Sequence, residues 1–270
     1  MDFSEISARG LVLLGCGKMG GALLAGWLRG GLNPASVFVV DPMPSEWLRA
    51  QGVHINQPLP ENPAFVLLAV KPQMMAAALP SVASHGNGTT VFLSIAAGWP
   101  LHAFESALGG QSPIIRAMPN TPAAVGHGIS ALIGNAHTTA AQLDLAEALL
   151  SAVGQTVRLD DESQMDAVTA VSGSGPAYVF HLIETLAAAG SAQGLPADLA
   201  MKLARATVAG AGHLAESADE DPAQLRINVT SPGGTTAAAL AVLMDPDTGF
   251  PNLLPRAVKA AADRGRELGA

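Results

Sequence analysis

The chain reads Leu11-Val-Leu-Leu-Gly-Cys-Gly-Lys-Met-Gly20 near its start, where a short apolar run passes into closely spaced glycines. Gly15, Gly17 and Gly20 follow the pattern G-x-G-x-x-G, directly after a predicted strand and at the start of a predicted helix. In that context the first glycine permits a tight turn, the second lets a pyrophosphate approach the backbone, and the third lets the helix pack on the strand. Such turns also arise for packing alone, so it is the placement that predicts a dinucleotide site.

Short β-branched and aliphatic runs alternate with helical stretches around this motif. The predicted strands are residues 11–15, 37–41, 65–70, 91–95 and 114–118, and two more, 129–133 and 156–159, flank a helical stretch over 138–153. This rhythm is typical of a parallel sheet with helices on both faces. We therefore predict an α/β fold with an N-terminal Rossmann-like, doubly wound parallel sheet, in which the last two strands extend the edge.

The second half of the chain changes class. Strand signals vanish after about Asp161, and helix-forming segments take over at 165–193, 197–217, 235–243 and 254–268. We predict a dinucleotide-binding domain over residues 1–162 and an all-helical domain over 163–270. The helices are rich in Ala and Gly and poor in aromatic residues, so each buries little on its own. We expect the helical domain to complete its core by forming a homodimer.

Composition excludes several classes of protein. Hydrophobic residues make up 49% of the chain, yet no segment approaches the roughly 18 consecutive apolar residues of a membrane span. A net charge of −8 without a basic cluster argues against nucleic-acid binding. The single cysteine and the unpaired spacing of the histidines predict no disulfide and no metal site, which fits a cytoplasmic protein. The expected partner is a small molecule or a second copy.

Asp41 closes the second predicted strand about 20 residues after the glycines, where an acid accepts hydrogen bonds from the adenine ribose. This position favours NADH over NADPH. A turn-forming Asp before Pro42 is the alternative interpretation. No arginine follows Asp41 to bind a 2′-phosphate, although Ser45 could contribute to such a site.

A second glycine motif, Ser231-Pro-Gly-Gly-Thr-Thr236, precedes an alanine-rich predicted helix. It places free backbone N–H groups and hydroxyls at a helix start, a site suited to a carboxylate or phosphate. Taken alone, the motif is better explained by a simple N-cap with a proline-glycine turn.

With these motifs in order, the chain resembles the pyrroline-5-carboxylate reductases, the last enzymes of proline biosynthesis, over nearly its full length. The matching motifs are Gly15-Cys-Gly-Lys-Met-Gly20, Ala69-Val-Lys-Pro72, Ser94-Ile-Ala-Ala-Gly98, Arg116-Ala-Met-Pro-Asn-Thr-Pro122, Asp166-Ala-Val-Thr169 with Ser172-Gly-Ser-Gly-Pro-Ala-Tyr178, and Ser231-Pro-Gly-Gly-Thr-Thr236. The last two are specific, whereas many dehydrogenases share the glycine pattern. The resemblance implies hydride transfer from NADH or NADPH to 1-pyrroline-5-carboxylate, giving L-proline, in a homodimer of interlocked helical domains.

The resemblance also implies which residues bind the cofactor. They are Gly15, Cys16, Gly17, Lys18, Met19, Gly20, Asp41, Asn56, Ala69, Val70, Lys71, Pro72, Ala96, Ala97, Gly98, Met118, Pro119 and Asn120. Among these, Asn56 is expected near the adenosine and Met118 to Asn120 near the nicotinamide.

For the substrate, the resemblance implies a loop contributed by the partner chain. The substrate residues are Glu162, Asn228, Gly233, Gly234, Thr235 and Thr236. Gly233 and Gly234 would offer backbone donors to the carboxylate, and Thr236 is the expected catalytic hydroxyl, which contacts the ring nitrogen as donor or proton relay. Glu162 lies in an acidic run that would ordinarily be a solvated turn, and only its spacing before Asp166 supports the assignment.

Two departures and three alternatives remain. Pro42 stands where many relatives carry a basic residue, and Arg226-Ile227 stands where many carry Lys-Asp. A non-catalytic dinucleotide-binding protein and a reductase of a related cyclic imine are alternative functions. A 3-hydroxyacid dehydrogenase would place a catalytic lysine on the long interdomain helix, but residues 165–193 contain none. The sequence leaves open the choice between NADH and NADPH and whether dimers assemble further.

Overall fold

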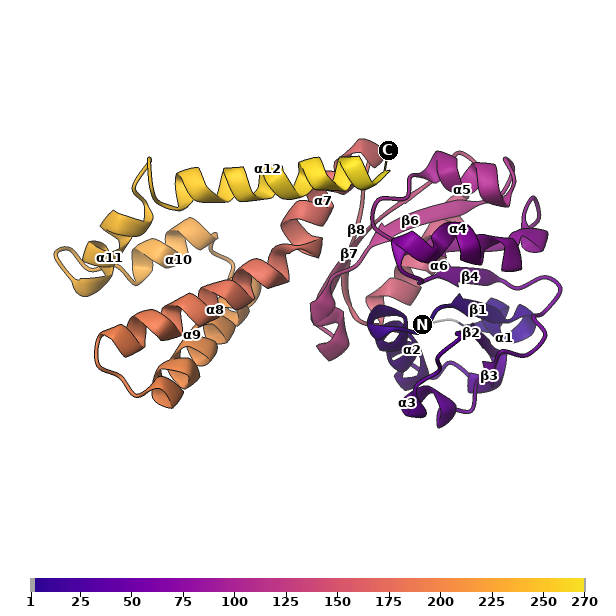
Figure 1. Ribbon diagram of the computed structural model, residues 1–270, viewed down its shortest axis with the longest axis horizontal. Helices are drawn as coiled ribbons and strands as arrows, with labels where there is room; N and C mark the ends of the chain where they lie inside the picture. The colour runs from indigo at the N-terminus through magenta and orange to yellow at the C-terminus, as the bar shows by residue number, and fades with distance from the viewer. Residues whose placement is uncertain (1–2, 270) are drawn as a thin grey trace. The chain divides into compact units, whose positions relative to one another are not determined.

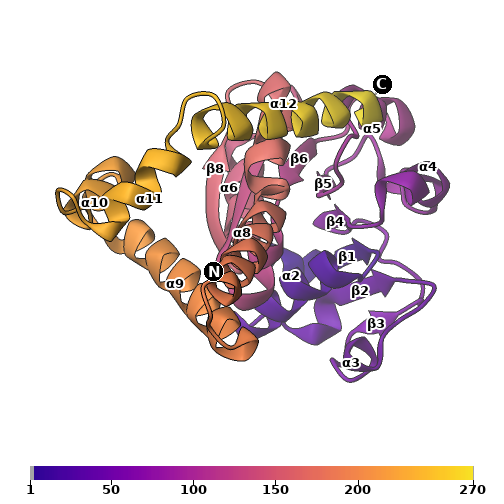
Figure 2. The same ribbon diagram turned by 60° about the vertical axis from the view of Figure 1, so that its left-hand side comes forward.

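The structure, a computed structural model, describes residues 3–269 and divides into two compact units. Unit 1 comprises Met1–Gly173 together with Ala262–Ala270, and unit 2 comprises Ser174–Ala261 (Figures 1 and 2). The predicted domain boundary after residue 162 thus precedes the division between the compact units, and the last residues of the chain group with unit 1.

An eight-stranded sheet forms the centre of unit 1, in the order β3-β2-β1-β4-β5-β6-β7-β8. The strands are β1 (Leu11–Leu14), β2 (Val37–Val40), β3 (His54–Ile55), β4 (Phe65–Leu68), β5 (Val91–Ser94), β6 (Ile114–Met118), β7 (Gly128–Gly134) and β8 (Gly154–Arg158). Strands β1 to β6 pair in parallel, β7 runs antiparallel to β6, and β8 is parallel to β7. The predicted Rossmann-like sheet is confirmed, with β7 and β8 extending its edge.

Helices cover both faces of this sheet. They are α1 (Ser4–Arg9), α2 (Lys18–Arg29), α3 (Glu46–Arg49), α4 (Met75–Ala78), α5 (Leu101–Leu108) and α6 (Ala140–Ser151). Because side chains alternate along a strand, Leu11 and Leu13 pack with residues of α2 and α6, whereas Val12 and Leu14 pack with α4 and α5. Buried Trp27 donates from Nε1 to the carbonyl oxygen of Leu149 at 2.8 Å, which joins α2 to α6.

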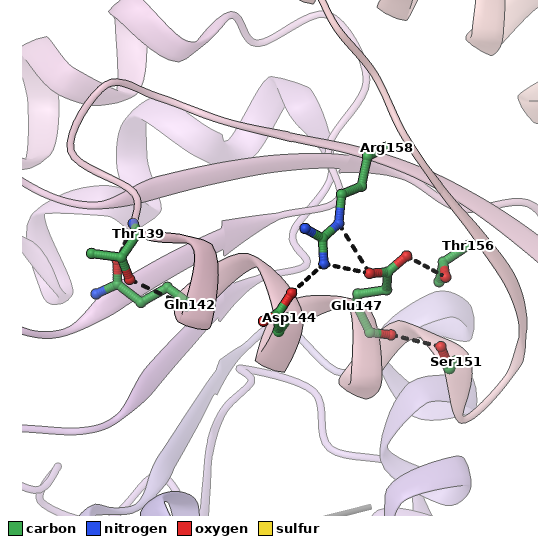
Figure 3. Close-up of polar contacts among 7 residues, drawn as sticks. All are labelled: Thr139, Gln142, Asp144, Glu147, Ser151, Thr156 and Arg158. Atoms are coloured by element: carbon green, nitrogen blue, oxygen red, sulfur yellow. Dashed lines mark hydrogen bonds and ion pairs between the residues drawn. The ribbon is translucent and has the colours of Figure 1, made fainter.

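A polar network joins the edge strand β8 to α6 (Figure 3). Arg158 donates from Nε to Glu147 Oε2 at 3.0 Å and from Nη2 to Asp144 Oδ1 at 2.5 Å. Thr156 Oγ1 donates to Glu147 Oε1 at 3.0 Å. The hydrogen bond from Arg158 lowers the pKa of Glu147, whose side chain is half-buried. These contacts place charged groups along an edge strand, which discourages pairing with other chains.

The prediction of one continuous helix over 165–193 is wrong. It consists of α7 (Met165–Val168), a π-helical turn over Thr169–Gly173, and α8 (Gly175–Ala192). Thr169 Oγ1 donates back to the carbonyl oxygen of Met165 at 2.8 Å, and Pro176 lies in the first turn of α8. Because a proline has no backbone N–H to donate to the preceding turn, a new α-helix begins at this point.

Unit 2 contains α8, α9 (Ala197–Ser217), α10 (Pro222–Asn228), α11 (Thr235–Leu243) and the first part of α12 (Phe250–Gly269). The predicted bounds of α9 and α11 are confirmed, whereas α12 begins four residues before its predicted start at 254. A Cβ on Gly190 would lie 3.4 Å from that of Ala200, so its absence lets α8 and α9 approach closely.

The helices of unit 2 leave many of their large apolar side chains exposed. Among the described residues of this unit, the buried apolar residues are Ala187, Ala200 and Ala204. The exposed ones include Phe180, Leu203, Leu214, Val242 and Leu253. An apolar surface of this extent is typical of an interface between chains. None of the described helices is long and apolar enough to cross a membrane.

Candidate functional site

A cavity of about 740 Å³ lies at the carboxyl ends of β1, β2 and β4 in unit 1. It is lined by Gly15, Cys16, Gly17, Lys18, Gly21, Ala25, Asp41, Pro42, Met43, Ser45, Trp47, Ala69, Val70, Lys71 and Met74. Strand order reverses direction between β1 and β4, and open α/β sheets bind ligands at such a point. The first glycine motif therefore lies at the expected ligand position.

Glycine suits each of the three positions of this motif for a different structural reason. Gly15 has a φ of +88°, and a Cβ there would lie 3.0 Å from the backbone nitrogen of Val70. A Cβ on Gly20 would lie 2.7 Å from the carbonyl oxygen of Gly15. Gly17, which precedes α2 without a side-chain cap, has open space where its Cβ would point. The free N–H groups and this open space fit a dinucleotide pyrophosphate.

Asp41 is fixed in place beside the glycines. Its Oδ2 accepts a hydrogen bond from Cys16 N at 2.7 Å, and its Oδ1 accepts one from Met43 N at 2.8 Å. Asn56, which follows β3, supports it by accepting from Asp41 N at 3.0 Å and donating to Asp41 O at 2.8 Å. Asn56 therefore orders the acidic residue and does not itself line the cavity.

The second glycine motif forms the start of α11 in unit 2. Gly233 has a φ of +69°, and a Cβ on Gly234 would lie 2.4 Å from Ser231 Oγ, so both positions favour glycine. Gly234 is the N-cap residue, and no side chain caps α11, which begins with Thr235 and Thr236. Its first N–H groups are therefore free to bind a carboxylate.

The preceding helix, α10, has a side-chain cap, unlike α11. Asp221 Oδ1 accepts from Gln224 N at 2.8 Å and caps α10, and Asn228 lies in the last turn of that helix. Asn228 Oδ1 accepts from Gln224 Nε2 at 2.8 Å. A cavity of about 410 Å³ between α10 and α11 is lined by Arg226, Ile227, Thr230, Ala237, Leu240, Ala241 and Met244. It contains none of the predicted substrate residues.

Comparison with known proteins identifies the family. Residues 162–268 match the model for pyrroline-5-carboxylate reductase dimerisation, and residues 10–98 match that for NADP oxidoreductase, coenzyme F420-dependent. The pyrroline-5-carboxylate reductase of Pseudomonas aeruginosa is 40% identical over 264 residues, 96% of each chain. The chain belongs to the pyrroline-5-carboxylate reductase family.

Two solved structures of this family share the fold along 97% of this chain. The pyrroline-5-carboxylate reductase of Coxiella burnetii aligns with a TM-score of 0.90 at 33% identity, covering 97% of this chain and 99% of the other. The pyrroline carboxylate reductase of Plasmodium falciparum, solved with NADP bound, aligns with a TM-score of 0.84 at 27% identity, covering 97% and 98%. The chain is thus an NAD(P)H-dependent oxidoreductase of this family.

The structure brings together part of the predicted cofactor set. Gly15, Cys16, Gly17, Lys18, Asp41, Ala69, Val70 and Lys71 line the cavity, whereas Met19, Gly20, Asn56, Pro72, Ala96, Ala97, Gly98, Met118, Pro119 and Asn120 do not. Met19 and Gly20 lie in the first turn of α2, and the remaining residues lie at or after the carboxyl ends of parallel strands, at the same edge of the sheet. Sequence reasoning missed Gly21, Ala25, Met43, Trp47 and Met74, because no motif marks them.

Residues at the ends of β5 and β6 make contacts inside unit 1. Gly98 has a φ of +78°, and a Cβ there would lie 3.2 Å from the carbonyl oxygen of Leu268. Asn120 Oδ1 accepts from Ile129 N at 3.0 Å, and its Nδ2 donates to Ser172 Oγ at 3.4 Å. These contacts order the edge of the sheet next to the π-helical turn.

Glu162 lies in unit 1, and its Oε1 accepts two hydrogen bonds. Leu101 N donates to it at 2.8 Å from the start of α5, and Arg116 Nη1 donates at 2.8 Å from β6. The Arg116 side chain is only 7% exposed and that of Glu162 is 29% exposed. Glu162 therefore joins a helix start to a central strand, whereas the other predicted substrate residues lie in unit 2.

Removing this carboxylate should destabilise unit 1. We expect Glu162→Ala to lower the free energy of unfolding by about 2–4 kcal/mol, because it leaves the buried Arg116 guanidinium and the Leu101 N–H without their acceptor. Glu267→Ala, which breaks the exposed pair with Arg264, should cost less than about 1 kcal/mol. Chemical denaturation measures both, and equal losses would contradict a structural role for Glu162.

The Cys16 thiol should be unreactive at neutral pH. Burial, followed by the charge of Asp41, raises its pKa to about 11, so about one thousandth is thiolate at pH 8. We expect alkylation by iodoacetamide to be far slower than in the unfolded chain and to rise about tenfold per pH unit up to the pKa. Mass spectrometry against time measures the rate. Rapid labelling of the folded protein at pH 7 would contradict the raised pKa of this half-buried thiol.

Proposed function

We propose that this protein reduces 1-pyrroline-5-carboxylate to L-proline with NADH or NADPH. The observation that carries the proposal is the uncapped start of α11 behind Gly233 and Gly234, in a chain whose glycine cradle also fits a dinucleotide. A dinucleotide-binding protein without this chemistry would have no need of a second anion-binding helix start. The similarity to the Pseudomonas aeruginosa reductase along 96% of the chain supports the same activity.

The chemistry places modest demands on side chains. When bound, the reduced nicotinamide supplies a hydride to the C5 imine carbon, the C5–N double bond becomes single, and a proton on nitrogen completes L-proline. A protonated cyclic imine is already electrophilic. The chain must therefore position the two reactants, exclude water and deliver a proton to the ring nitrogen.

We assign these tasks to the loop before α11. The free N–H groups of its first turn, beginning with Thr235, would bind the substrate carboxylate, which the helix dipole also stabilises. Thr236 would contact the ring nitrogen with its hydroxyl. Asn228 and Glu162 complete the proposed substrate set, and for Glu162 the observed contacts favour positioning through Leu101 and Arg116.

We propose further that the active form is a homodimer in which unit 2 of each chain covers the other. The exposed apolar side chains of α8, α9 and α12 support this, together with the match of residues 162–268 to the dimerisation model. Light scattering should give at least twice the chain mass of 27.3 kDa. A larger even multiple would show that dimers assemble further, and a monomer would contradict the proposal.

The activity is tested with purified protein and 1-pyrroline-5-carboxylate. We expect loss of NADH or NADPH absorbance, with L-proline identified as the product. Dinucleotide binding without turnover would favour the non-catalytic alternative. Faster turnover of a six-membered cyclic imine carboxylate would instead favour a reductase of a related substrate.

A further inference from the structure

The segment that follows β2 forms one end of the large cavity. Asp41, Pro42, Met43, Ser45 and Trp47 all line it. Met43 is 86% exposed and Trp47 is 42% exposed, although both are large apolar side chains. Exposed apolar side chains that gather at a cavity indicate a surface kept for a ligand.

The Asp41 carboxylate at this end of the cavity is held in a fixed orientation. Both carboxylate oxygens of Asp41 accept backbone hydrogen bonds, from Cys16 N at 2.7 Å and Met43 N at 2.8 Å. Each oxygen has a second lone pair that can accept a hydroxyl. A neutral diol, such as the 2′- and 3′-hydroxyls of a ribose, therefore suits this position, and a second anion does not.

Trp47 forms an apolar part of the wall of the cavity that Asp41 also lines. It lies on α3, which Ser45 caps by accepting from Leu48 N at 3.2 Å. Its ring reaches across to α2, where the Cβ that Gly21 lacks would lie 3.8 Å from Trp47 Cζ3. Met43, on the same segment, adds a soft thioether surface. Flat and polarisable side chains of this kind pack well against a planar base.

Positive charge in the cavity lies on other elements. Among the described lining residues, the cations are Lys18 at the start of α2 and Lys71 after β4. The segment from residue 41 to 47 carries two acids, Asp41 and Glu46, and no cation. A phosphate placed here would lie beside a fixed carboxylate and apolar groups, where its charge is poorly compensated.

We infer that this end of the cavity selects the unphosphorylated adenosine of NADH over the 2′-phosphorylated adenosine of NADPH, with Met43 and Trp47 acting beside Asp41. The inference rests on the proposed function in that the cavity must take a dinucleotide. It concerns residues 41–47 of this chain, and the Plasmodium falciparum relative with NADP bound is only 27% identical.

The test uses fragments that lack nicotinamide, so that reductase activity plays no part. Titration calorimetry of the full protein should give a Kd for ADP-ribose at least tenfold lower than that for 2′-phospho-ADP-ribose. Equal affinities or the reverse order would overturn the inference even if 1-pyrroline-5-carboxylate is reduced, as would failure of both fragments to bind. Preference for ADP-ribose without any turnover would refute the proposed function alone.

A matched pair of variants locates the selecting residues. Met43→Arg should lower the preference for ADP-ribose at least tenfold, because it places a cation beside the 2′ position. Met74→Arg, at an exposed methionine on the segment after β4, should change both affinities alike. If the two variants alter the ratio equally, Met43 does not face the 2′ position and the assignment is wrong.

Trp47 also provides a direct optical signal. Trp27 is buried, and Trp99 donates to Pro72 O at 3.2 Å and lines a separate cavity. ADP-ribose should therefore alter the tryptophan emission of the wild-type protein, and Trp47→Phe should abolish that change. A change that survives in Trp47→Phe would place the base elsewhere and overturn the role of Trp47.

Discussion

Replacing Thr236 by alanine is expected to lower kcat by about 100- to 10,000-fold and to leave the dinucleotide Kd within about twofold. The range is that of a lost acid-base contact, because Thr236 is the proposed hydroxyl partner of the ring nitrogen. Its position at the uncapped start of α11 places it beside the N–H groups that would bind the substrate carboxylate. Steady-state kinetics, together with dinucleotide titration, measures both quantities.

Two further variants separate the hydroxyl from the shape of the side chain. Thr236→Ser retains the hydroxyl and should keep kcat within about tenfold of the wild type. Thr236→Val retains the shape and should behave like Thr236→Ala. If Thr236→Val turned over at the wild-type rate, Thr236 would have no part in proton delivery.

Adding one methyl group should weaken dinucleotide binding at Gly17 but destabilise the fold at Gly20. Gly17→Ala should change the free energy of unfolding by less than about 1 kcal/mol, because its Cβ meets nothing within 4 Å. That Cβ would enter the space proposed for the pyrophosphate, so the dinucleotide Kd should rise more than about tenfold.

Gly20→Ala should instead destabilise the fold by about 2–4 kcal/mol, because its Cβ would lie 2.7 Å from the carbonyl oxygen of Gly15. Thermal unfolding and dinucleotide titration of both proteins provide the comparison. Wild-type affinity in Gly17→Ala would show that the pyrophosphate does not lie over this loop.

Much of the fold follows from the sequence, because hydrophobic periodicity and glycine motifs are local signals. Six of the observed strands begin within one residue of their predicted starts, and the helix bounds of α9 and α11 agree. The two-residue strand β3 is too short to carry a periodic pattern. The antiparallel direction of β7 depends on pairing with β6, which local sequence does not encode.

The first glycine motif marks the position of the large cavity, whereas no motif marks several of the residues around it. Gly15, Gly17 and Asp41 line the cavity as expected, because their roles depend on backbone conformation and strand ends. Met43 and Trp47 belong to no motif, so only the structure shows that they share this cavity. The role of Thr236 and the extent of the cofactor set stay predictions until the variants are measured.

The alanine-only interior of unit 2 has a kinetic consequence. Ala187, Ala200 and Ala204 are too small to drive the collapse of this half, so completing it depends on an encounter between two chains. The final step of folding would then be second order, and the apparent stability would rise with protein concentration. At low expression, the time taken to find a partner would set how long these apolar helices remain open to proteases.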